Sequence, residues 1–259
     1  MIPITAVVVL YNVAYTDSVT LQALLPRKDI PIILCDNSTR PLGNERIAEE
    51  YPQVTYLSMG GNVGLPKAYN AALDRLIESD GLVCLFDDDT NVGEDYFTAL
   101  QQAITDHPEA DIYLPTVYDK LGLMSPCYLN GVKTSRISNP DEIDLTRVSG
   151  INSAMAIRLR VFADYRYDEG YFLDCVDHAF VREMRRRGKE IAVFRAGLFQ
   201  DFSGANAYNT ESGRIRAKIF YRDFYRFCSD SLFHKLCGMA IIARRWILAH
   251  APGGKEDAV

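Results

Sequence analysis

CLFDDDTNV, residues 84–92, places three consecutive aspartates directly after an apolar run. That run is typical of a buried strand, expected over Leu82–Phe86, so negative charge gathers where burial is costly. Three adjacent carboxylates repel one another and cannot all stay ionised in a dry site without compensation. In an extended segment Asp87 and Asp89 can face one ligand while Asp88 points elsewhere. A hard divalent cation between the outer two would supply the compensation.

Two other interpretations of this stretch were considered. An EF-hand loop is excluded, because Val92 and Thr98 stand where that loop requires Gly and Glu. An acidic turn could instead cap a helix starting near Gly93, where a carboxylate is stabilised by roughly 0.3 to 1 kcal/mol. A single aspartate would suffice for a cap, so the cation site is favoured.

Outward from this stretch, strand-like apolar runs alternate with segments of helical period, which predicts a mainly parallel sheet covered by helices. Strands are expected at Ile4–Leu10, Ile30–Cys35, Val54–Leu57 and Leu82–Phe86, with helices at Asp17–Leu25, Gly43–Glu50 and Leu65–Ser79. Ordered structure is expected again at Arg158–Tyr165 and in a helix over Asp174–Gly188. Ligands of open parallel sheets bind beyond the carboxyl ends of the strands, so the polar residues there should converge: Tyr11, Asn12, Asp36, Asn37 and the three aspartates.

Two further motifs keep two interpretations each. GGNVGLPKAYNAAL, residues 60–73, is a glycine-rich turn opening a helix, which could cradle phosphates or could simply permit tight packing. DEGYFLDCVDHAFVREMRRRG, residues 168–188, would place Asp174 and Asp177 on one helical face if the helix began near Asp174. A carboxylate there could act as general base, a role worth roughly 10² to 10⁴ in rate, or could only complement the helix dipole.

Composition bounds the classes of protein. With 259 residues, 48% of them hydrophobic, the chain can form one large α/β domain or such a domain with a helical tail. A net charge of −6 argues against bulk binding of nucleic acid. Residues 211–250 nevertheless carry eight Lys or Arg and three Asp or Glu, a local charge of +5. The six cysteines lack a CxxC pair, which favours reduced thiols in the cytosol, and no apolar run is long enough to span a membrane.

The order of motifs carries a resemblance to a known family. VVVLYN, CDNS, GGNVGLPKAYN, FDDDT, SGINSAM and DEGYFLDCVDHAF, with Gly188 downstream, follow one another over residues 4–204. This ordered set resembles the inverting glycosyltransferases of family 2, most closely their bacterial rhamnosyltransferase and galactofuranosyltransferase branch. The resemblance implies an α/β GT-A fold with a mostly parallel central sheet flanked by helices and a C-terminal helical extension. It divides the chain into a catalytic domain over 1–205, with a nucleotide-sugar half (1–110) and an acceptor half (111–205), and basic amphipathic helices over 206–259.

The resemblance also assigns roles to residues of this chain. Its Asp-x-Asp metal motif falls on Asp87 and Asp89, and its base aspartate, eleven residues before a glycine, falls on Asp177. The positions implied for donor and nucleotide binding are Tyr11, Asn12, Asp36, Asn37, Asn62, Gly64, Lys67, Asn70, Asp87 and Asp88, and those for acceptor binding are Gly150 and Asp174.

The chain departs from the family pattern at two positions. Ala179 stands where an acidic residue usually follows the base, and the stretch QDFSG puts Asp201 where a histidine often completes the metal site. Aspartate is a competent oxygen ligand for Mg²⁺ or Mn²⁺, so a metal site that includes Asp201 is still expected.

The implied function is a metal-dependent, inverting transfer of a sugar, with rhamnose or galactofuranose favoured, from a dTDP- or UDP-linked donor to a glycan or lipid-linked glycan in cell-surface polysaccharide synthesis. A sugar-phosphate nucleotidyltransferase is disfavoured because YNVAYTDS, which follows the first strand, is not a glycine-rich basic loop. A non-catalytic glycan- or nucleotide-binding protein would lack a base.

The C-terminal segment HKLCGMAIIARRWILAH, residues 234–250, pairs an apolar face with basic residues. Such a helix could lie in an anionic membrane interface, pack on the protein, or form a homodimer interface. The expected location is cytoplasmic, with peripheral contact to the cytoplasmic face of the inner membrane.

Overall fold

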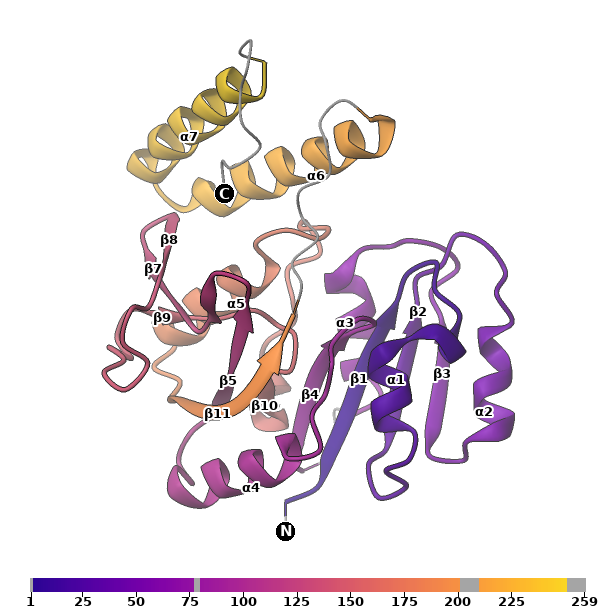
Figure 1. Ribbon diagram of the computed structural model, residues 1–259. Coiled ribbons are helices and arrows are strands. Elements are labelled where there is room, and N and C mark those ends of the chain that lie inside the picture. Colours follow the sequence, from indigo (N-terminus) through magenta and orange to yellow (C-terminus); the bar gives the residue numbers. More distant parts are fainter. Residues whose placement is uncertain (1, 77–79, 201–209, 251–259) are drawn as a thin grey trace.

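The computed structural model describes residues 2–76, 80–200 and 210–250, and its centre is a mostly parallel sheet. The strand order is β11-β5-β10-β4-β1-β2-β3, with β6 paired to β5 (Figure 1). The strands of this sheet are β1 (Ile4–Leu10), β2 (Ile32–Asp36), β3 (Val54–Ser58), β4 (Leu82–Asp87), β5 (Ile112–Asp119), β6 (Gly122–Ser125), β10 (Ala156–Arg158) and β11 (Ile191–Phe199). Only β6 and β10 run antiparallel to their neighbours in the described sheet.

Helices and a small second sheet complete the fold. The α-helices are α1 (Val19–Leu24), α2 (Ile47–Glu50), α3 (Leu65–Leu73), α4 (Tyr96–Asp106), α5 (Val176–Arg186), α6 (Glu211–Phe227) and α7 (Leu232–His250). Short 3-10 turns are η1 (Tyr15–Asp17), η2 (Asn44–Arg46), η3 (Leu159–Ala163) and η4 (Cys228–Asp230). The second sheet has the order β8-β7-β9, formed by β7 (Cys127–Asn130), β8 (Lys133–Arg136) and β9 (Val148–Ser149).

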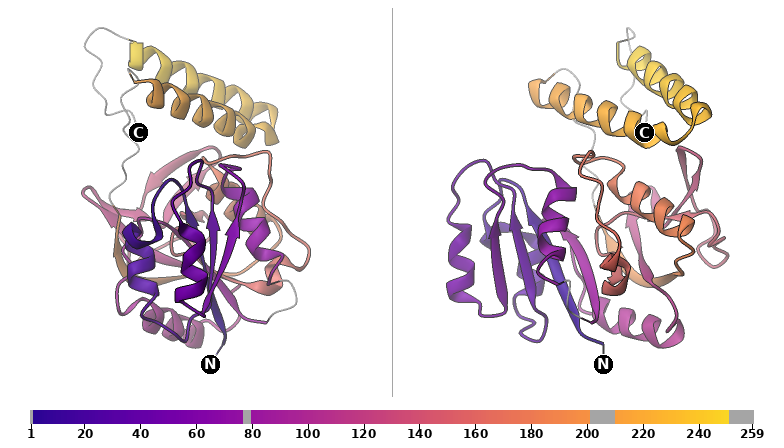
Figure 2. Two further views of the ribbon diagram at one scale, coloured as in Figure 1. Left: turned by 90° about the vertical axis from the view of Figure 1, so that its right-hand side faces the viewer. Right: turned by 180° about the vertical axis from the view of Figure 1, so that it is seen from behind.

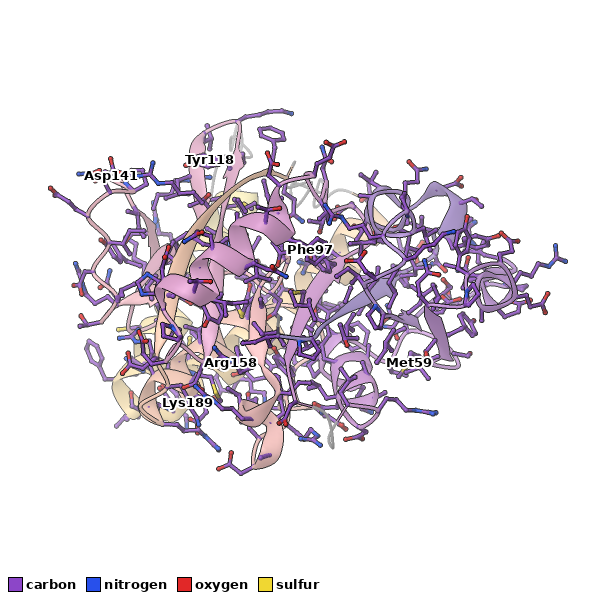
Figure 3. All side chains as sticks on the ribbon, turned by 90° about the horizontal axis from the view of Figure 1, so that it is seen from below. Met59, Phe97, Tyr118, Asp141, Arg158 and Lys189 are labelled. Carbon is purple, nitrogen blue, oxygen red and sulfur yellow. The ribbon has the colours of Figure 1, made fainter. Side chains whose placement is uncertain are left out.

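Both faces of the central sheet are buried, as its sequence predicts. Successive side chains of a strand point to opposite faces, so Val7 and Val9 of β1 join one apolar cluster while Ala6 and Val8 join another. The first cluster contains residues of α3 and α5, and the second contains residues of α1 and α4. In the view from below, α4 with Phe97 lies in front of the sheet (Figure 3). Burial on both faces explains why these strands are continuous apolar runs.

The four expected strands are present, with end points that differ by no more than two residues. The segment Arg158–Tyr165 is the end of β10 followed by η3, rather than a regular helix. The helix expected from Asp174 begins at Val176, because Cys175 has a left-handed φ of 60° and breaks the helical path. Asp174 and Asp177 therefore do not share a helical face, and that expectation was wrong.

Helices α6 and α7 lie together over the end of the sheet where the parallel strands finish (Figure 2). Phe224 and Phe227 of α6 are buried in the cluster that contains α3 and α5, and Cys237, Ile241 and Ile242 of α7 pack against it. The C-terminal helices are thus attached to the rest of the protein through the main core. No described helix combines the length and the apolar character that crossing a bilayer requires.

Candidate active site

The triple aspartate lies at the end of β4, beside the ends of β1 and β2. In the sheet register Val9 pairs with Asp87, and Leu10 pairs with Asp36. Because β1 runs between β2 and β4, these carboxyl groups flank the end of β1. The convergence expected from the sequence is confirmed for these three strand ends.

The turn after β4 is fixed by hydroxyl groups from the start of α1. Ser18 Oγ donates to the carbonyl of Asp88 at 2.7 Å, and Thr20 Oγ1 lies 2.5 Å from the carbonyl of Asp87. The side chain of Asp88 accepts the backbone N–H of Tyr11 at 3.2 Å, so it is turned toward β1. Helix α4 has Asp95 at its N-cap position, so none of the three aspartates caps it. This excludes the helix-cap interpretation of the motif.

The carboxyl groups of this turn suppress one another's ionisation. Burial, followed by the negative charges of Asp89, Asp88 and Asp177, raises the pKa of Asp87 to about 7. Burial also raises the pKa of Asp88 to about 6, against the lowering effect of the Tyr11 N–H. Asp89 is exposed, and its Oδ1 accepts a 3.4 Å hydrogen bond from Gln200 Nε2. Repulsion of this kind is relieved when a cation is bound.

The donor atoms at this turn suit a divalent cation. Asp87 and Asp89 offer hard carboxylate oxygens, the ligands that Mg²⁺ and Mn²⁺ prefer, in a turn where burial and neighbouring carboxylates raise the pKa of Asp87. Among the described residues no group of three His, Cys, Asp or Glu side chains comes together to hold a metal. Asp201, the expected third ligand, lies outside the described residues.

Three of the polar residues at the ends of β1 and β2 are hydrogen-bonded to residues between Ser38 and Gly64. Asp36 accepts from the Ser38 N–H, from Asn44 Nδ2 and from the Tyr56 hydroxyl, at 2.9 to 3.1 Å. Asn12 has a φ of 58°, and its Oδ1 accepts from the Thr39 N–H at 2.9 Å; Asn37 is buried and spans 3.4 Å to the carbonyl of Gly64. The side chain of Tyr11 is half-exposed. Nucleotide binding by these four residues remains a prediction.

The glycine-rich segment packs against the loop that precedes α5. Gly64 has a φ of 89°, and a Cβ there would lie 2.7 Å from the carbonyl oxygen of Phe172. The N–H of Leu65 donates to that oxygen at 2.7 Å, and Asn62 Oδ1 accepts the N–H of Gly64 at 3.2 Å. The tight-packing interpretation is thereby confirmed at Gly64, while phosphate contact stays a prediction.

Two polar residues of α3 that were expected near the donor differ in their surroundings. Lys67 is exposed. Asn70 is buried, and its carboxamide bonds both the N–H and the carbonyl of Tyr167 at 2.9 Å. Asn70 therefore joins α3 to the segment that leads toward α5, and its predicted donor contact is untested.

Asp177 lies in the first turn of α5, and its charge reaches the turn after β4, where it helps to raise the pKa of Asp87. Its Oδ1 accepts the N–H of His178 at 2.7 Å. The next residue, His178, contacts the small sheet, because its Nδ1 lies 2.8 Å from Ser149 Oγ of β9. The candidate base and the candidate metal ligands thus come from segments about ninety positions apart, and the negative charge of Asp177 is felt at Asp87.

Sequence reasoning missed a group of buried polar atoms near this site. Tyr69 OH, Tyr167 OH and Asn152 Oδ1 are buried and have no hydrogen-bond partner among the described residues. Burial raises the pKa of Tyr69 far above its usual value, and the charges of Asp87 and Asp177 add to this effect. The available signal was the helical spacing of Tyr69 with Ala72 and Leu73, which puts this tyrosine on the buried face of α3.

Comparison with known proteins defines the family. The family model for glycosyl transferase family 2 matches residues 5–164, well over half of the chain. The protein belongs to glycosyltransferase family 2. A solved structure of similar fold is the mannosyltransferase PcManGT from Pyrobaculum calidifontis in complex with GDP-Man and Mn²⁺, with a TM-score of 0.59 and 15% sequence identity over 95% of this chain and 71% of that chain. No curated protein sequence matches. The predicted GT-A fold and the predicted glycosyltransferase class are confirmed.

The C-terminal helices of this glycosyltransferase, which follow the matched residues, hold the loop in front of the candidate base. Asp223 of α6 is fully buried, and its Oδ2 accepts the backbone N–H groups of Phe172, Leu173 and Asp174 at 2.8 to 3.0 Å. Its Oδ1 accepts from the guanidinium of Arg222 at 2.9 and 3.0 Å. One carboxylate therefore orders three consecutive peptide groups immediately before α5.

Two ion pairs add to this attachment of the glycosyltransferase loop. Arg216 binds Asp174 through Nη1 and Nη2, and Arg226 binds Asp168 through Nε at 2.9 Å and Nη2 at 2.7 Å. Burial raises the pKa of Asp174, and Arg216 opposes that rise. The predicted acceptor contact of Asp174 is untested, as is that of Gly150, whose backbone packs against Leu114.

Proposed function

We propose that the protein is a metal-dependent, inverting glycosyltransferase that uses a nucleoside-diphosphate sugar. The observation that carries this proposal is the placement of Asp177 where its charge raises the pKa of Asp87, the last residue of β4. Rhamnose or galactofuranose, linked to dTDP or UDP, is the favoured donor because of the order of the sequence motifs. The Mn²⁺ and GDP-Man bound to the mannosyltransferase of similar fold support a divalent cation and a nucleotide sugar.

The proposed chemistry is a single displacement at the anomeric carbon. Asp87 and Asp89 would hold the cation, which acts as a Lewis acid on the departing diphosphate when it is bound. Asp177 takes the proton from the acceptor hydroxyl as that oxygen attacks. One displacement inverts the anomeric centre without a covalent enzyme intermediate. The acceptor is proposed to be a glycan or a lipid-linked glycan of cell-surface polysaccharide synthesis.

The decisive experiment replaces the base. Asp177→Asn should lower kcat by about 10² to 10⁴. It should leave Mn²⁺-dependent binding of the donor within a few-fold of wild type, because the amide keeps the shape of the side chain. The matched control is Asp106→Asn, at an exposed position at the end of α4. Unchanged turnover in Asp177→Asn would favour a binding protein without a base.

Donor identity requires a screen. Hydrolysis and transfer would be measured in Mn²⁺ with dTDP-rhamnose, UDP-galactofuranose, UDP-galactose, UDP-glucose, UDP-N-acetylglucosamine and GDP-mannose. We expect turnover of one donor, and we expect Asp89→Ala to abolish its metal-dependent binding. Absence of turnover and of metal-dependent binding with every donor would refute the proposed function.

The location we propose is the cytoplasmic face of the membrane, with α7 as a peripheral contact. One side of α7 packs on the core, whereas Leu232, Phe233, Leu236, Met239 and Trp246 are exposed. An exposed apolar row with basic neighbours suits an anionic interface. A dimer through the same face is the competing outcome, which the concentration dependence of the molecular mass would reveal.

A further inference from the structure

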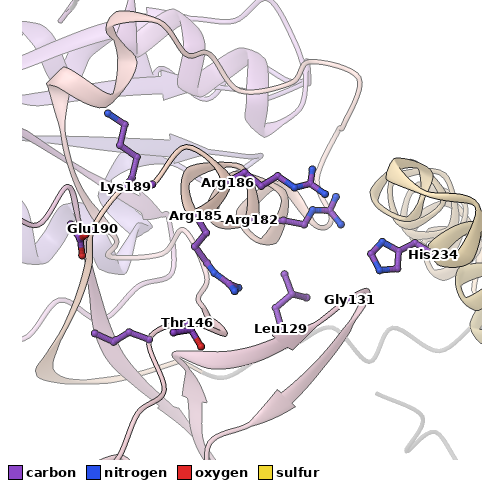
Figure 4. A pocket seen from close by; sticks show the side chains of 11 residues that line it. Leu129, Gly131, Thr146, Arg182, Arg185, Arg186, Lys189, Glu190 and His234 are labelled. Carbon is purple, nitrogen blue, oxygen red and sulfur yellow. The ribbon is translucent and has the colours of Figure 1, made fainter.

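A cavity of about 490 Å³ lies at the opposite end of α5 from the candidate base. Its walls are the turn between β7 and β8, the segment before β9, the last turns of α5 and the start of α7 (Figure 4). From Asp177 to Arg185 is eight residues, or about 12 Å along the helix axis at about 1.5 Å per residue. A molecule in this cavity would therefore occupy a different place from a donor diphosphate held at Asp87 and Asp89.

The lining of the cavity carries a surplus of positive charge. Arg182, Arg185, Arg186 and Lys189 contribute four positive charges, and Glu190 contributes one negative charge. A second negative charge comes from Asp230, so four minus two leaves a surplus of two, without counting His234.

Asp230 is shared among three of these groups. It lies 3.3 Å from Arg182, 2.8 Å from Arg186 and 2.6 Å from His234. A single carboxylate therefore binds both guanidinium groups and cannot neutralise the two of them. Their own positions are fixed by the folded structure, since Arg182 also donates to the carbonyl of Phe227 at 2.9 Å.

The other two cations of the lining are Arg185 and Lys189, which are not among the partners of Asp230. Among the described residues neither side chain forms an ion pair or a hydrogen bond, and burial lowers the pKa of Arg185. Figure 4 shows Arg185 reaching into the space between Leu129 and Thr146. The nearby carboxylate of Asp144 is already bonded to Arg147 and Thr146. A partly desolvated guanidinium without a partner is stabilised by an incoming anion.

We propose that this cavity binds a phosphate or diphosphate group. Arginines of α5, the lysine that follows it and the histidine of α7 approach from several directions, and a group with two or more charges and several acceptor oxygens can engage more than one of them. A single carboxylate would leave part of the surplus unpaired. The inference rests on the cavity alone and does not depend on the donor, the metal or the base proposed above.

The test uses inorganic pyrophosphate as the probe, with the full-length protein in EDTA so that the Asp87 and Asp89 site does not contribute through a metal. Calorimetric titration should show binding that weakens at least tenfold in Arg185→Gln and in Lys189→Gln. The matched control is Arg75→Gln, which removes the same charge at an exposed position after α3 and should change affinity less than threefold. Thermal unfolding would confirm that each variant is folded. If Arg185→Gln does not fold, Lys189→Gln provides the test by itself.

Weaker binding in Arg185→Gln and Lys189→Gln than in Arg75→Gln would support a phosphate site in this cavity. The proposal would be overturned if Arg185→Gln and Arg75→Gln bound pyrophosphate equally well, or if the wild type did not bind it at millimolar concentration.

A second experiment identifies the source of the phosphate or diphosphate group. Leu232 and Phe233, both exposed, precede His234 on α7, so a lipid chain could continue from the cavity. Farnesyl diphosphate binding at least tenfold tighter than pyrophosphate would assign a lipid-borne diphosphate, and equal binding would assign a free phosphate compound.

Discussion

The carboxyl group of Asp87 shows how one side chain can be unfavourable for the fold while serving the proposed chemistry. Its pKa of about 7, against an ordinary 3.8, means that the folded protein binds this proton more tightly than the unfolded chain does. Stability therefore falls as the pH rises from about 4 to about 7 in the absence of metal. A cation bound at this position would restore the stability that is lost when the carboxyl ionises.

This gives a prediction for Asp87→Asn in EDTA. At pH 8 the variant should be more stable than wild type by about 1 kcal/mol or more, since one unit of pKa shift corresponds to about 1.4 kcal/mol. At about pH 3 and below the difference should shrink toward zero, because the wild-type carboxyl is then mostly protonated in both states. Denaturant unfolding across this pH range measures the effect, and a difference that does not vary with pH would contradict it.

Gly64 is a residue at which the turn before α3 approaches the loop before α5 closely. Its φ of 89° favours glycine, and an added Cβ would meet the Phe172 carbonyl at 2.7 Å. Gly64→Ala should therefore lower the free energy of unfolding by about 2 kcal/mol or more, combining backbone strain with the clash. Gly93→Ala is the control, because Gly93 has an ordinary φ and open space around it. Similar unfolding midpoints for the two variants would argue against this contact.

At the scale of elements, the apolar runs that are buried on both faces predict β1, β2, β3 and β4 well, since their hydrophobic pattern is continuous. Strand β10 has only three residues, too few for a period, and it enters the sheet antiparallel between β4 and β5. The left-handed conformation of Cys175 has no signal in the sequence, so the predicted start of α5 lay two residues before the observed start. In the sequence Asp223 is one acidic residue within a basic segment. Its hydrogen bonds to residues about fifty positions earlier could not be predicted, because they form only in the folded protein.

That buried carboxylate supports a prediction about α6. Asp223→Ala leaves three backbone N–H groups and Arg222 without their acceptor, which should cost about 2 to 4 kcal/mol of stability. The loop before α5 should also exchange its amide hydrogens faster. The control is Arg222→Gln, whose side chain is largely exposed and should cost less than about 1 kcal/mol. Hydrogen exchange at residues 172–174 that is unchanged in Asp223→Ala would show that the loop is held by other contacts.

At the scale of the whole molecule, α6 and α7 pack on the apolar cluster that contains α3 and α5, so the exposed row of α7 belongs to the same body as the candidate active site. The same chain segment that orders the loop before Asp177 continues into a helix whose inner side joins the core. Contact of α7 with a membrane would consequently orient the end of the sheet where the candidate site lies. The basic composition of the C-terminal segment could predict neither its attachment to the core nor its exposed apolar row, because composition does not distinguish the side that packs from the side that is exposed.

The combined substitution Leu232→Ser and Phe233→Ser tests that orientation. Both side chains are more than 70% exposed, so stability should change little. Partitioning onto anionic vesicles should fall at least tenfold, because burying such a side chain in an apolar phase contributes about 1.5 to 3 kcal/mol. Leu121→Ser, at an 81% exposed position between β5 and β6, is the control and should bind as wild type does. Equal partitioning of all three proteins would mean that α7 does not contact the bilayer, and loss of a dimer in the double variant would instead assign this face to a second copy of the chain.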